Sequence, residues 1–267
     1  MCIVLNLLGA KVTGYSLKPK SNPNLFDLAK IKKIIKKSVI ADVRNYKKLY
    51  VEINKSKADI IFHLAAQPLV RHSYLYPKKT FDTNMTGTLN ILECIRIIKK
   101  VKSAVIITSD KVYDPSQNKI FKETDKLGGS DPYSASKVCC EYIFTSYINS
   151  FFSKNIKKKI ATARAGNVIG GGDYSEDRLI PDIYSFAKKK EKKIILRNPN
   201  STRPWQHVLE PLSGYLLLAE KLYKNQTKNQ IQNWNFGPNV SSCKSVRYIA
   251  SKFTKPLKLK IKIVKSK

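Results

Sequence analysis

The sequence is poor in acidic residues, histidine and cysteine. It has 19 acidic residues against 50 basic ones, and its three histidines do not cluster, so a histidine-based metal site is not expected. The five cysteines are odd in number and include no Cys-x-x-Cys pair, which argues against a disulfide framework or a zinc site. We therefore expect a reduced, cytoplasmic protein without a metal.

Long hydrophobic runs and an early glycine-rich turn are also missing. The first ten residues, MCIVLNLLGA, are apolar but short and lack a basic leading region, so they are a poor signal peptide and cannot span a bilayer. No G-x-G-x-x-G turn follows an early strand, and the glycines at 170–172 come after a late one. We interpret the latter as a substrate loop, so the usual cradle for a dinucleotide pyrophosphate is absent.

The net charge of +31 would ordinarily indicate a polyanionic partner. The lysines, however, lie in scattered runs at 30–37, 99–102, 188–193 and 258–267 rather than in one stripe. Only eight of the 50 basic residues are arginine, which is typical of a biased codon usage. We interpret the lysines as solvated surface and expect no specific nucleic-acid partner and no membrane partner.

Apolar runs alternate with amphipathic stretches, as in a parallel α/β sheet. This predicts a doubly wound, Rossmann-type dinucleotide-binding domain over residues 1–165 and a smaller, substrate-facing lobe over residues 166–267. In such a sheet, ligands bind beyond the carboxyl ends of the strands. The predicted strands are 11–15, 39–42, 59–64, 103–108 and 159–163, and the predicted helices are 30–37, 46–56, 77–99, 132–152, 180–190 and 208–224.

The segment YSASK at 133–137 places a phenol and an ammonium one helical turn apart. An ammonium near Tyr133 favours the phenolate, so with Lys137 this tyrosine can act as a base near neutral pH. Spacing alone is weak, because 14 tyrosines and 42 lysines predict about two such pairs by chance. Four occur, and we interpret the other three as surface coincidences: Tyr74/Lys78, Tyr184/Lys188 and Tyr248/Lys252.

The setting distinguishes this pair from the others. Asp131 and Pro132 are typical of a helix start, and the trio Ser109, Asp110 and Lys111 ends the strand before it. A hydroxyl, a carboxylate and an amine at a strand end suit a sugar-oxidising active site. The plain alternative for Lys111 is one more surface lysine.

Arginines stand out in a chain that otherwise uses lysine. Four of them fall in loops expected to face substrate, where a planar guanidinium can bind a diphosphate: Arg71, Arg178, Arg197 and Arg203. Arg178 and Arg203 are the preferred diphosphate candidates. The alternative is pairing with a nearby carboxylate such as Asp177 or Glu210. His63, at a strand end, is interpreted as a packed side chain.

Five segments resemble the CDP-glucose 4,6-dehydratases, which are extended short-chain dehydrogenase/reductases. They are TSDK, YSASK, HLAAQPLVRHSY, ARAGNVIGGGDYSEDRLIPD and RPWQHVLEPLSGYLLLAEKL, and the likeness runs from about residue 5 to 237. The resemblance implies an NAD-retaining lyase that converts CDP-glucose to CDP-4-keto-6-deoxyglucose. It also implies a place in lipopolysaccharide (O-antigen) biosynthesis and a homodimer.

The resemblance further implies individual roles. Tyr133 would take the proton of the sugar 4-hydroxyl, Lys137 would hold the nicotinamide ribose, and Ser109 would bond the reacting oxygen. Lys111 would remove the proton on carbon 5 while Asp110 protonates the departing 6-hydroxyl, and a lysine here, where dTDP-glucose enzymes have glutamate, favours the CDP branch. Two further sets are implied: Asp42, Leu64, Ala65 and Ala66 toward the cofactor, and Gln67, Arg71, Asn167, Arg178 and Arg203 toward the substrate.

The chain departs from the family at its beginning and end. Aligned on LLGAKVTGYSL, it begins within the family's first helix, after the first strand and glycine turn, and it ends early after NFGP at 235–238. We therefore expect a sheet without its first strand, two incomplete domains and exposed edges on the neighbouring strands. Ser16 stands where an acidic residue often selects NAD over NADP.

Two alternatives stay open. One is another nucleotide-sugar epimerase or dehydratase of the same superfamily. An epimerase or a decarboxylating enzyme would share Tyr133 and Lys137 but would not need Asp110 and Lys111 for water loss. An inactive fragment without the glycine-rich loop is the other alternative.

Overall fold

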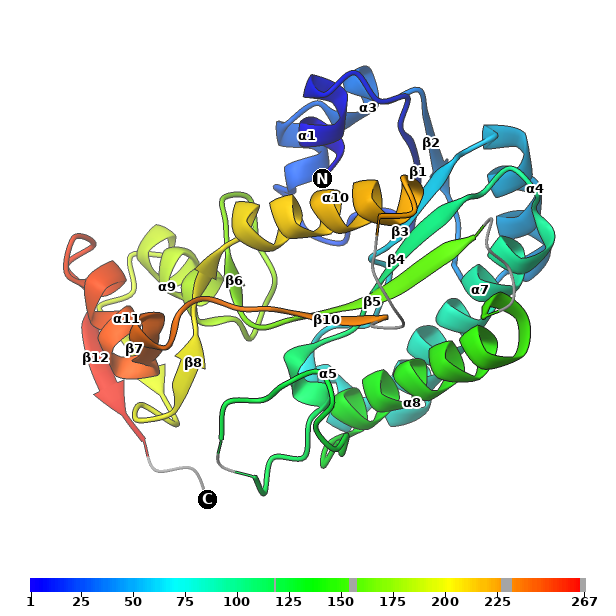
Figure 1. The fold of residues 1–267 in the computed structure, drawn as a ribbon. Helices are drawn as coiled ribbons and strands as arrows, with labels where there is room; N and C mark the ends of the chain where they lie inside the picture. Colours follow the sequence, from blue (N-terminus) through cyan, green and yellow to red (C-terminus); the bar gives the residue numbers. More distant parts are fainter. Residues whose placement is uncertain (118, 154–157, 227–231, 265–267) are drawn as a thin grey trace. The chain divides into compact units, whose positions relative to one another are not determined.

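The computed structural model describes residues 1–117, 119–153, 158–226 and 232–264 (Figure 1). The chain divides into two compact units. One segment beyond residue 165, Pro211–Phe236, belongs to the first unit and carries α10 (Leu209–Tyr223) from Pro211 on and β10 (Asn233–Phe236). The first unit comprises Met1–Lys18, Lys32–Ala165 and Pro211–Phe236, and the second comprises Pro19–Ile31, Gly166–Glu210 and Gly237–Lys267.

A four-stranded parallel sheet forms the centre of the first unit. Its order is β10-β5-β4-β3, with Phe62 beside Val105 and Val105 beside Ala161. The two middle strands are rich in small and β-branched residues and are almost wholly buried, as expected for a parallel sheet covered on both faces. The predicted α/β fold with a parallel sheet is confirmed. Its members besides β10 are β3 (Ile60–His63), β4 (Ser103–Ile107) and β5 (Lys159–Ala165).

A second parallel pair, β1 (Thr13–Ser16) and β2 (Lys37–Ile40), stands apart from this sheet. Among the described residues, β1 pairs with β2 alone and β3 pairs with β4 alone. The sheet of the first unit is therefore interrupted between β1 and β3. Ile60 and Phe62 of β3 are half-buried and pack against the core on the α10 side.

Helices cover both faces of the four-stranded sheet (Figure 1). One face packs against α4, α7 and α8 through a core that includes Leu49, Leu92 and Phe144. The other packs against α10, with Leu218 and Ala219 against Val105. Burial of these apolar surfaces holds the layers together. The helices are α4 (Tyr46–Ser56), α7 (Gly87–Ile97) and α8 (Pro132–Tyr147).

Shorter helices connect these elements. The helix predicted over 77–99 is α6 (Pro77–Phe81) and α7 joined by a π-helical turn, η1 (Asp82–Thr86). The helix predicted over 30–37 is wrong in extent, because α3 (Ile31–Ile34) stops before Lys37, which pairs with Thr13 in the parallel ladder. The others in this unit are α1 (Cys2–Leu7), α5 (Val70–Leu75), η2 (Asp110–Val112) and η3 (Ile148–Phe152).

The second unit has its own small core. Ile183 of α9 (Leu179–Lys188), Ile194 and Leu196 of β7 (Lys193–Leu196) and Ala250 of α11 (Val246–Thr254) are buried together. Strand β7 pairs in parallel with β12 (Lys260–Ile263). The remaining elements are α2 (Leu25–Leu28), β6 (Val168–Ile169), β8 (Thr202–Pro204), β9 (Gln206–His207), η4 (Val240–Ser242) and β11 (Cys243–Ser245).

His63 is the last residue of β3 and is buried, with 4% of its surface exposed. Its Nε2 lies 3.4 Å from the Thr88 hydroxyl. Burial, with a smaller contribution from the Lys137 charge, lowers the imidazole pKa to about 3. The interpretation of His63 as a packed side chain therefore agrees with its surroundings, and the ring is neutral in the folded protein.

The His63→Gln variant should make the protein less sensitive to acid. The unfolded chain binds a proton at this imidazole below about pH 6.5, but the folded chain does so only below about pH 3. Stability is therefore lost as pH falls through this window, by up to about 1.4 kcal/mol per pH unit. Urea unfolding between about pH 6 and pH 4 should show a flatter free energy of unfolding for the variant.

The exposed His207 supplies the matched control. His207→Gln should keep the wild-type slope against pH. An unchanged slope in His63→Gln would show that His63 does not carry this acid sensitivity.

Candidate active site

The end of β4 carries the predicted trio in a tight turn. Ser109 is 5% exposed, and its hydroxyl donates to Asp110 Oδ1 and accepts from the Lys111 amide, both at 3.2 Å. The turn η2 begins directly after it. A buried strand thus delivers a hydroxyl, a carboxylate and an amine to one corner of the sheet.

Helix α8 begins as its sequence predicts. Asp131 is the N-cap, accepting from the amides of Tyr133 and Ser134 at 2.9 and 3.0 Å, and Pro132 takes the first helical position. Tyr133 and Lys137 follow one turn apart on the same side of the helix, and both are buried. The helix start therefore fixes where this pair lies.

The structure brings the two predicted segments together. The Lys137 ammonium donates to the Ile107 carbonyl at 3.0 Å, which ties the middle of α8 to the last residue of β4. The Lys111 ammonium lies 6.0 Å from the centre of the Tyr133 ring, at the outer limit of a cation–π contact. Phenol, hydroxyl, carboxylate and both amines thus belong to one region of the first unit.

Tyr215 of α10 is a neighbour that the sequence did not indicate. Its side chain is buried against Phe236, and burial raises its pKa, with smaller contributions from Asp110 and Tyr133. A buried, neutral phenol beside the trio can donate a hydrogen bond without adding charge. The RPWQHVLEPLSGY segment predicted a helix here but not which residue faces the sheet.

The predicted cofactor residues lie at or beyond the ends of β2 and β3. The Asp42 carboxylate is held by the Arg44 guanidinium at 2.6 and 3.0 Å, and this bond keeps the Asp42 pKa below its usual range. Leu64 is exposed, while Ala65 and Ala66 are half-buried. The set therefore offers an ionised carboxylate and an apolar strand end.

The predicted substrate residues are divided between the two units. Gln67 and Arg71 are in the first, and the Gln67 side chain bonds Leu69 and the Thr80 hydroxyl. The Asn84 carboxamide accepts from the Gln67 amide at 2.7 Å and donates to Ser136 of α8 at 2.8 Å. Gln67 is therefore built into a network that ends on α8.

Asn167, Arg178 and Arg203 belong to the second unit. Arg178 pairs with Asp173 at 3.2 Å, so a carboxylate partner is present, although not one of the two considered from the sequence. Arg203 is exposed and donates to the Thr202 carbonyl at 2.8 Å. An exposed guanidinium is well suited to an anionic ligand.

The second unit also has an open hollow of about 700 Å³ that the sequence did not predict. Burial raises the pKa of Asp182 in its wall to about 6, helped by the neighbouring Asp177. Three carboxylates, those of Glu176, Asp177 and Asp182, oppose one guanidinium, that of Arg197. This lining disfavours a diphosphate.

The described residues contain no cluster of histidine, cysteine, aspartate or glutamate suited to a metal ion. Within the same part of the chain, no helix has the length and apolarity needed to cross a bilayer.

Residues 4–245 match the family model described as GDP-mannose 4,6 dehydratase. The CDP-glucose 4,6-dehydratase of Salmonella typhimurium is 45% identical over 253 residues, which are 93% of this chain and 70% of that protein. Both matches cover most of the chain, including residues outside the five segments that resemble the CDP-glucose 4,6-dehydratases.

Solved structures agree on the fold. The dTDP-glucose 4,6-dehydratase of Bacillus anthracis, in complex with NAD, gives a TM-score of 0.80 at 21% identity, covering 100% of this chain and 80% of that one. A UDP-glucose-4-epimerase from Stenotrophomonas maltophila with bound NAD gives 0.83 at 20% identity, covering 100% and 82%. At such identities the likeness concerns the fold alone. Since the family model spans most of its residues, the chain belongs to the GDP-mannose 4,6 dehydratase family.

Proposed function

We propose that this protein is a nucleotide-sugar 4,6-dehydratase that acts on CDP-glucose and releases CDP-4-keto-6-deoxyglucose. The observation that carries the proposal is the 45% identity to a CDP-glucose 4,6-dehydratase over 93% of the chain. The meeting of Lys111 and Tyr133 beyond β4 supports it, because water loss needs an acid and a base in addition to the oxidising pair.

We propose NAD as the retained cofactor. The chemistry that NAD supplies when bound is acceptance of a hydride from sugar carbon 4 and its later return to carbon 6. The donor set fits its two ends: Tyr133 and Lys137 suit the nicotinamide ribose, and ionised Asp42 suits the adenosine. An ammonium has three donors, and the bond to Ile107 occupies one of those on Lys137. Leu64, Ala65 and Ala66 would line the riboses between these ends.

In this proposal Tyr133 takes the proton of the sugar 4-hydroxyl, and Ser109 donates a hydrogen bond to the same oxygen. Lys137 places positive charge one helical turn from Tyr133, on the same side of α8. Burial of both side chains limits competing contacts with water. Oxidation at carbon 4 makes the proton on carbon 5 acidic.

Elimination then uses the rest of the trio. Lys111, in its neutral form, removes the proton on carbon 5, and Asp110 protonates the departing 6-hydroxyl. The two groups come from adjacent positions in η2, so a single turn presents both acid and base. An epimerase has no need of this pair.

The first unit is proposed to be the cofactor-binding unit and the second the substrate lobe. Arg178 and Arg203 are proposed to bind the diphosphate, and Asn167, which precedes Arg178 in the sequence, is proposed to contact the substrate. Gln67 and Arg71 are proposed to contact the sugar. We also propose a cytoplasmic location and a role in lipopolysaccharide biosynthesis, which match a soluble sugar-nucleotide substrate.

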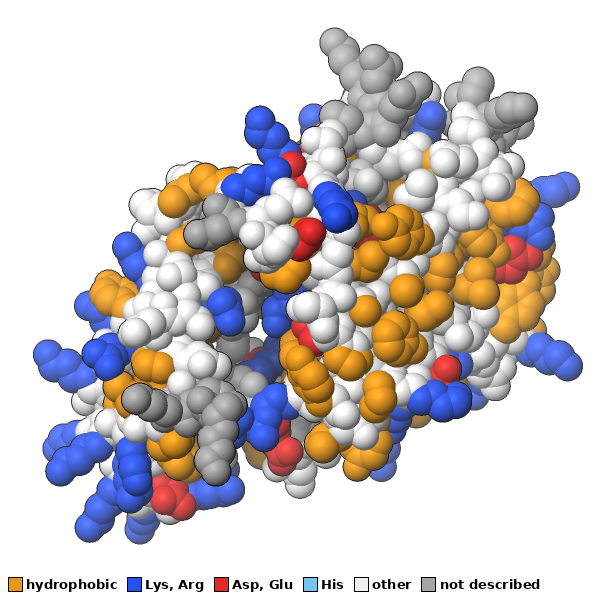
Figure 2. All heavy atoms as spheres, turned by 90° about the horizontal axis from the view of Figure 1, so that it is seen from below, with side chains coloured by type: hydrophobic (Ala, Val, Ile, Leu, Met, Phe, Trp, Pro, Cys, Tyr) orange, Lys and Arg blue, Asp and Glu red, His pale blue; other side chains and the backbone are white. Residues whose placement is uncertain are grey.

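A homodimer is proposed through α7 and α8. Seen from below, hydrophobic side chains gather over the part of the first unit where these helices lie (Figure 2). Helix α7 contacts α8 and η3 there: the Tyr147 hydroxyl of α8 donates to Glu93, and Arg96 lies 5.2 Å above the Phe151 ring of η3. The exposed apolar residues of α7, α8 and η3 include Leu89, Ile97, Tyr142 and Phe151.

Incubation with NAD and CDP-glucose tests the function. The wild-type protein should form a 4-keto-6-deoxy sugar, detected by its chromophore in alkali and by mass. Tyr133→Phe should slow product formation by about 100-fold or more, because the base is removed, while CDP-glucose still binds. Tyr248→Phe is the matched control, since Tyr248 also precedes a lysine by four residues on a helix but is exposed.

Absence of product from the wild-type protein would contradict the proposed function. Near-normal turnover of Tyr133→Phe would remove this tyrosine from the mechanism.

Lys111→Ala should separate oxidation from elimination. Proton removal from carbon 5 is lost in this variant, whereas Tyr133 remains, so reduced-nicotinamide absorbance should accumulate while dehydrated product falls about 100-fold. Lys126→Ala, which alters an exposed lysine, should behave as wild type. Product formation at the wild-type rate would exclude Lys111 as the base.

Tyr142→Glu should weaken the proposed dimer. A carboxylate in the middle of an apolar contact must lose its hydration, so the mass measured by light scattering should fall toward that of one chain. Ile120→Glu, at an exposed apolar residue outside α7 and α8, is the control. Equal masses for the two variants would argue against this face.

A further inference from the structure

Glu141 and Arg164 form an ion pair with almost no access to water. Their side chains are 1% and 2% exposed, and the guanidinium donates through Nε and a terminal nitrogen to the two carboxylate oxygens at 3.0 and 2.8 Å. Taking two charges out of water is costly, and apolar residues of similar size often serve stability equally well. Stability alone therefore does not explain why this ion pair is buried here.

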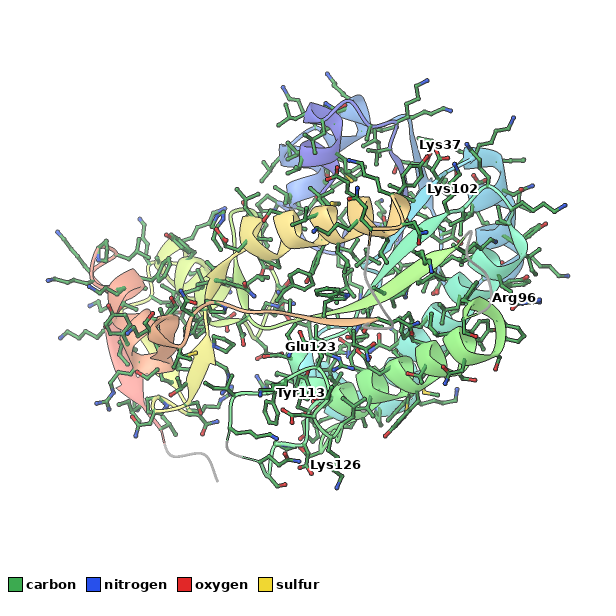
Figure 3. The ribbon with its side chains drawn as sticks, viewed as in Figure 1. Lys37, Arg96, Lys102, Tyr113, Glu123 and Lys126 are labelled. Carbon is green, nitrogen blue, oxygen red and sulfur yellow. The ribbon has the colours of Figure 1, made fainter. Side chains whose placement is uncertain are left out.

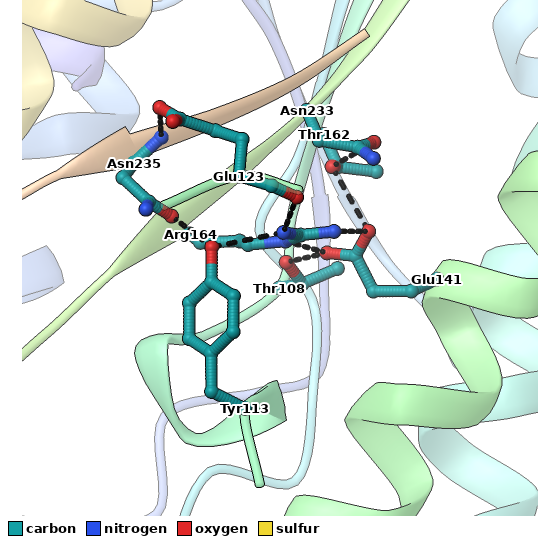
Figure 4. Close-up of polar contacts among 8 residues, drawn as sticks. All are labelled: Thr108, Tyr113, Glu123, Glu141, Thr162, Arg164, Asn233 and Asn235. Atoms are coloured by element: carbon teal, nitrogen blue, oxygen red, sulfur yellow. Dashed lines mark hydrogen bonds and ion pairs between the residues drawn. The ribbon is translucent and has the colours of Figure 1, made fainter. Parts of the chain in front are cut away.

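The carboxylate ties α8 to the residue directly after β4 and to the middle of β5. Its oxygens accept from the Thr108 hydroxyl at 2.5 Å and the Thr162 hydroxyl at 3.2 Å, in addition to Arg164 (Figure 4). Four bonds fill the accepting capacity of a carboxylate. Thr108 immediately precedes Ser109, so the bond reaches the residue that begins the proposed active site.

The guanidinium holds the other end of the same turn. It donates to the Tyr113 hydroxyl at 2.9 Å and to the Glu123 carbonyl at 3.0 Å. Tyr113 directly follows η2, and its hydroxyl donates to Asn235 of β10 at 2.6 Å. Tyr113 and Glu123 accordingly lie beside β10 (Figure 3).

The ion pair thus bonds the residues on both sides of the Ser109–Lys111 trio, Thr108 through Glu141 and Tyr113 through Arg164. Glu141 also stands one helical turn beyond Lys137 and two beyond Tyr133, on the same side of α8. The two segments that would share the chemistry are therefore fixed against one common buried anchor.

We propose that the Glu141–Arg164 pair is a positioning device that sets the place of Tyr133 and Lys137 relative to Ser109, Asp110 and Lys111. Neither residue touches the reacting atoms. Proton transfer depends on sub-ångström placement, so loss of the anchor slows the chemical steps while substrate affinity is kept. The catalytic consequence rests on the proposed function, whereas the anchoring of the two segments does not.

The test uses the double variant Glu141→Leu with Arg164→Met. Removing both charges leaves no unpaired ion in the core, so the variant should fold with a melting temperature close to that of wild type. The control replaces an exposed pair, Glu220→Gln with Lys224→Met on α10. The single variant Glu141→Asp is the conservative companion, because it keeps the ion pair while shortening the tether to α8 by one methylene.

Hydrogen exchange provides the readout that needs no activity. In the double variant, exchange should rise in peptides covering residues 108–114 and 131–138 and stay unchanged in β7 and α11 of the second unit. Unchanged exchange in the first two peptides overturns the proposal, whether or not the protein turns over CDP-glucose.

Kinetics provides the second readout. The double variant should lose about tenfold or more in kcat with KM within about twofold, and a larger deuterium isotope effect should appear with CDP-glucose labelled at carbon 4. Glu141→Asp should lie between it and the wild type. A folded double variant with wild-type kcat and isotope effect overturns the proposal. Absence of product from the wild type would instead overturn the proposed function, leaving hydrogen exchange to decide the anchor.

Discussion

Charges taken out of water are costly unless they are paired and hydrogen-bonded within the protein. In this protein Glu141 accepts four hydrogen bonds and Arg164 donates four. Their partners outside the pair come from Thr108 directly after β4, from β5 and from the segment after η2, and Tyr113 extends the network to β10. Moving any one of these segments would therefore remove a hydrogen bond from a buried charged group. The geometry beyond β4 is a consequence of that requirement.

The strands and long helices were predictable from the sequence because their signal is local. Apolar runs bounded by lysine-rich stretches located β3, β4 and β5 within a residue or two, and Asp131 with Pro132 located the start of α8. The helix predicted over 30–37 failed because backbone pairing of Lys37 with Thr13 overrides the local pattern. The pairing of β10 with β5 joins positions some 70 residues apart, as with Thr162 and Asn233, and leaves no local trace.

In the candidate site, too, features with a local sequence signal could be predicted, whereas contacts between distant residues could not. Tyr133 and Lys137 could be singled out because a four-residue spacing on a helix has a known geometric meaning. Glu141 continues that spacing by one more turn, yet a glutamate in a helix is usually a surface residue, and only its contact with Arg164 shows otherwise. Tyr215 was out of reach for a similar reason, because it comes from a helix more than 70 residues after Tyr133.

The interruption between β1 and β3 has a consequence for behaviour in solution. Unpaired strand edges are templates on which other chains can add, and among the described residues β3 pairs on one side only, with β4. The charge of +31 opposes such encounters by mutual repulsion between copies. Salt shortens the range of that repulsion. The protection against aggregation that the lysine-rich surface gives therefore decreases as ionic strength rises.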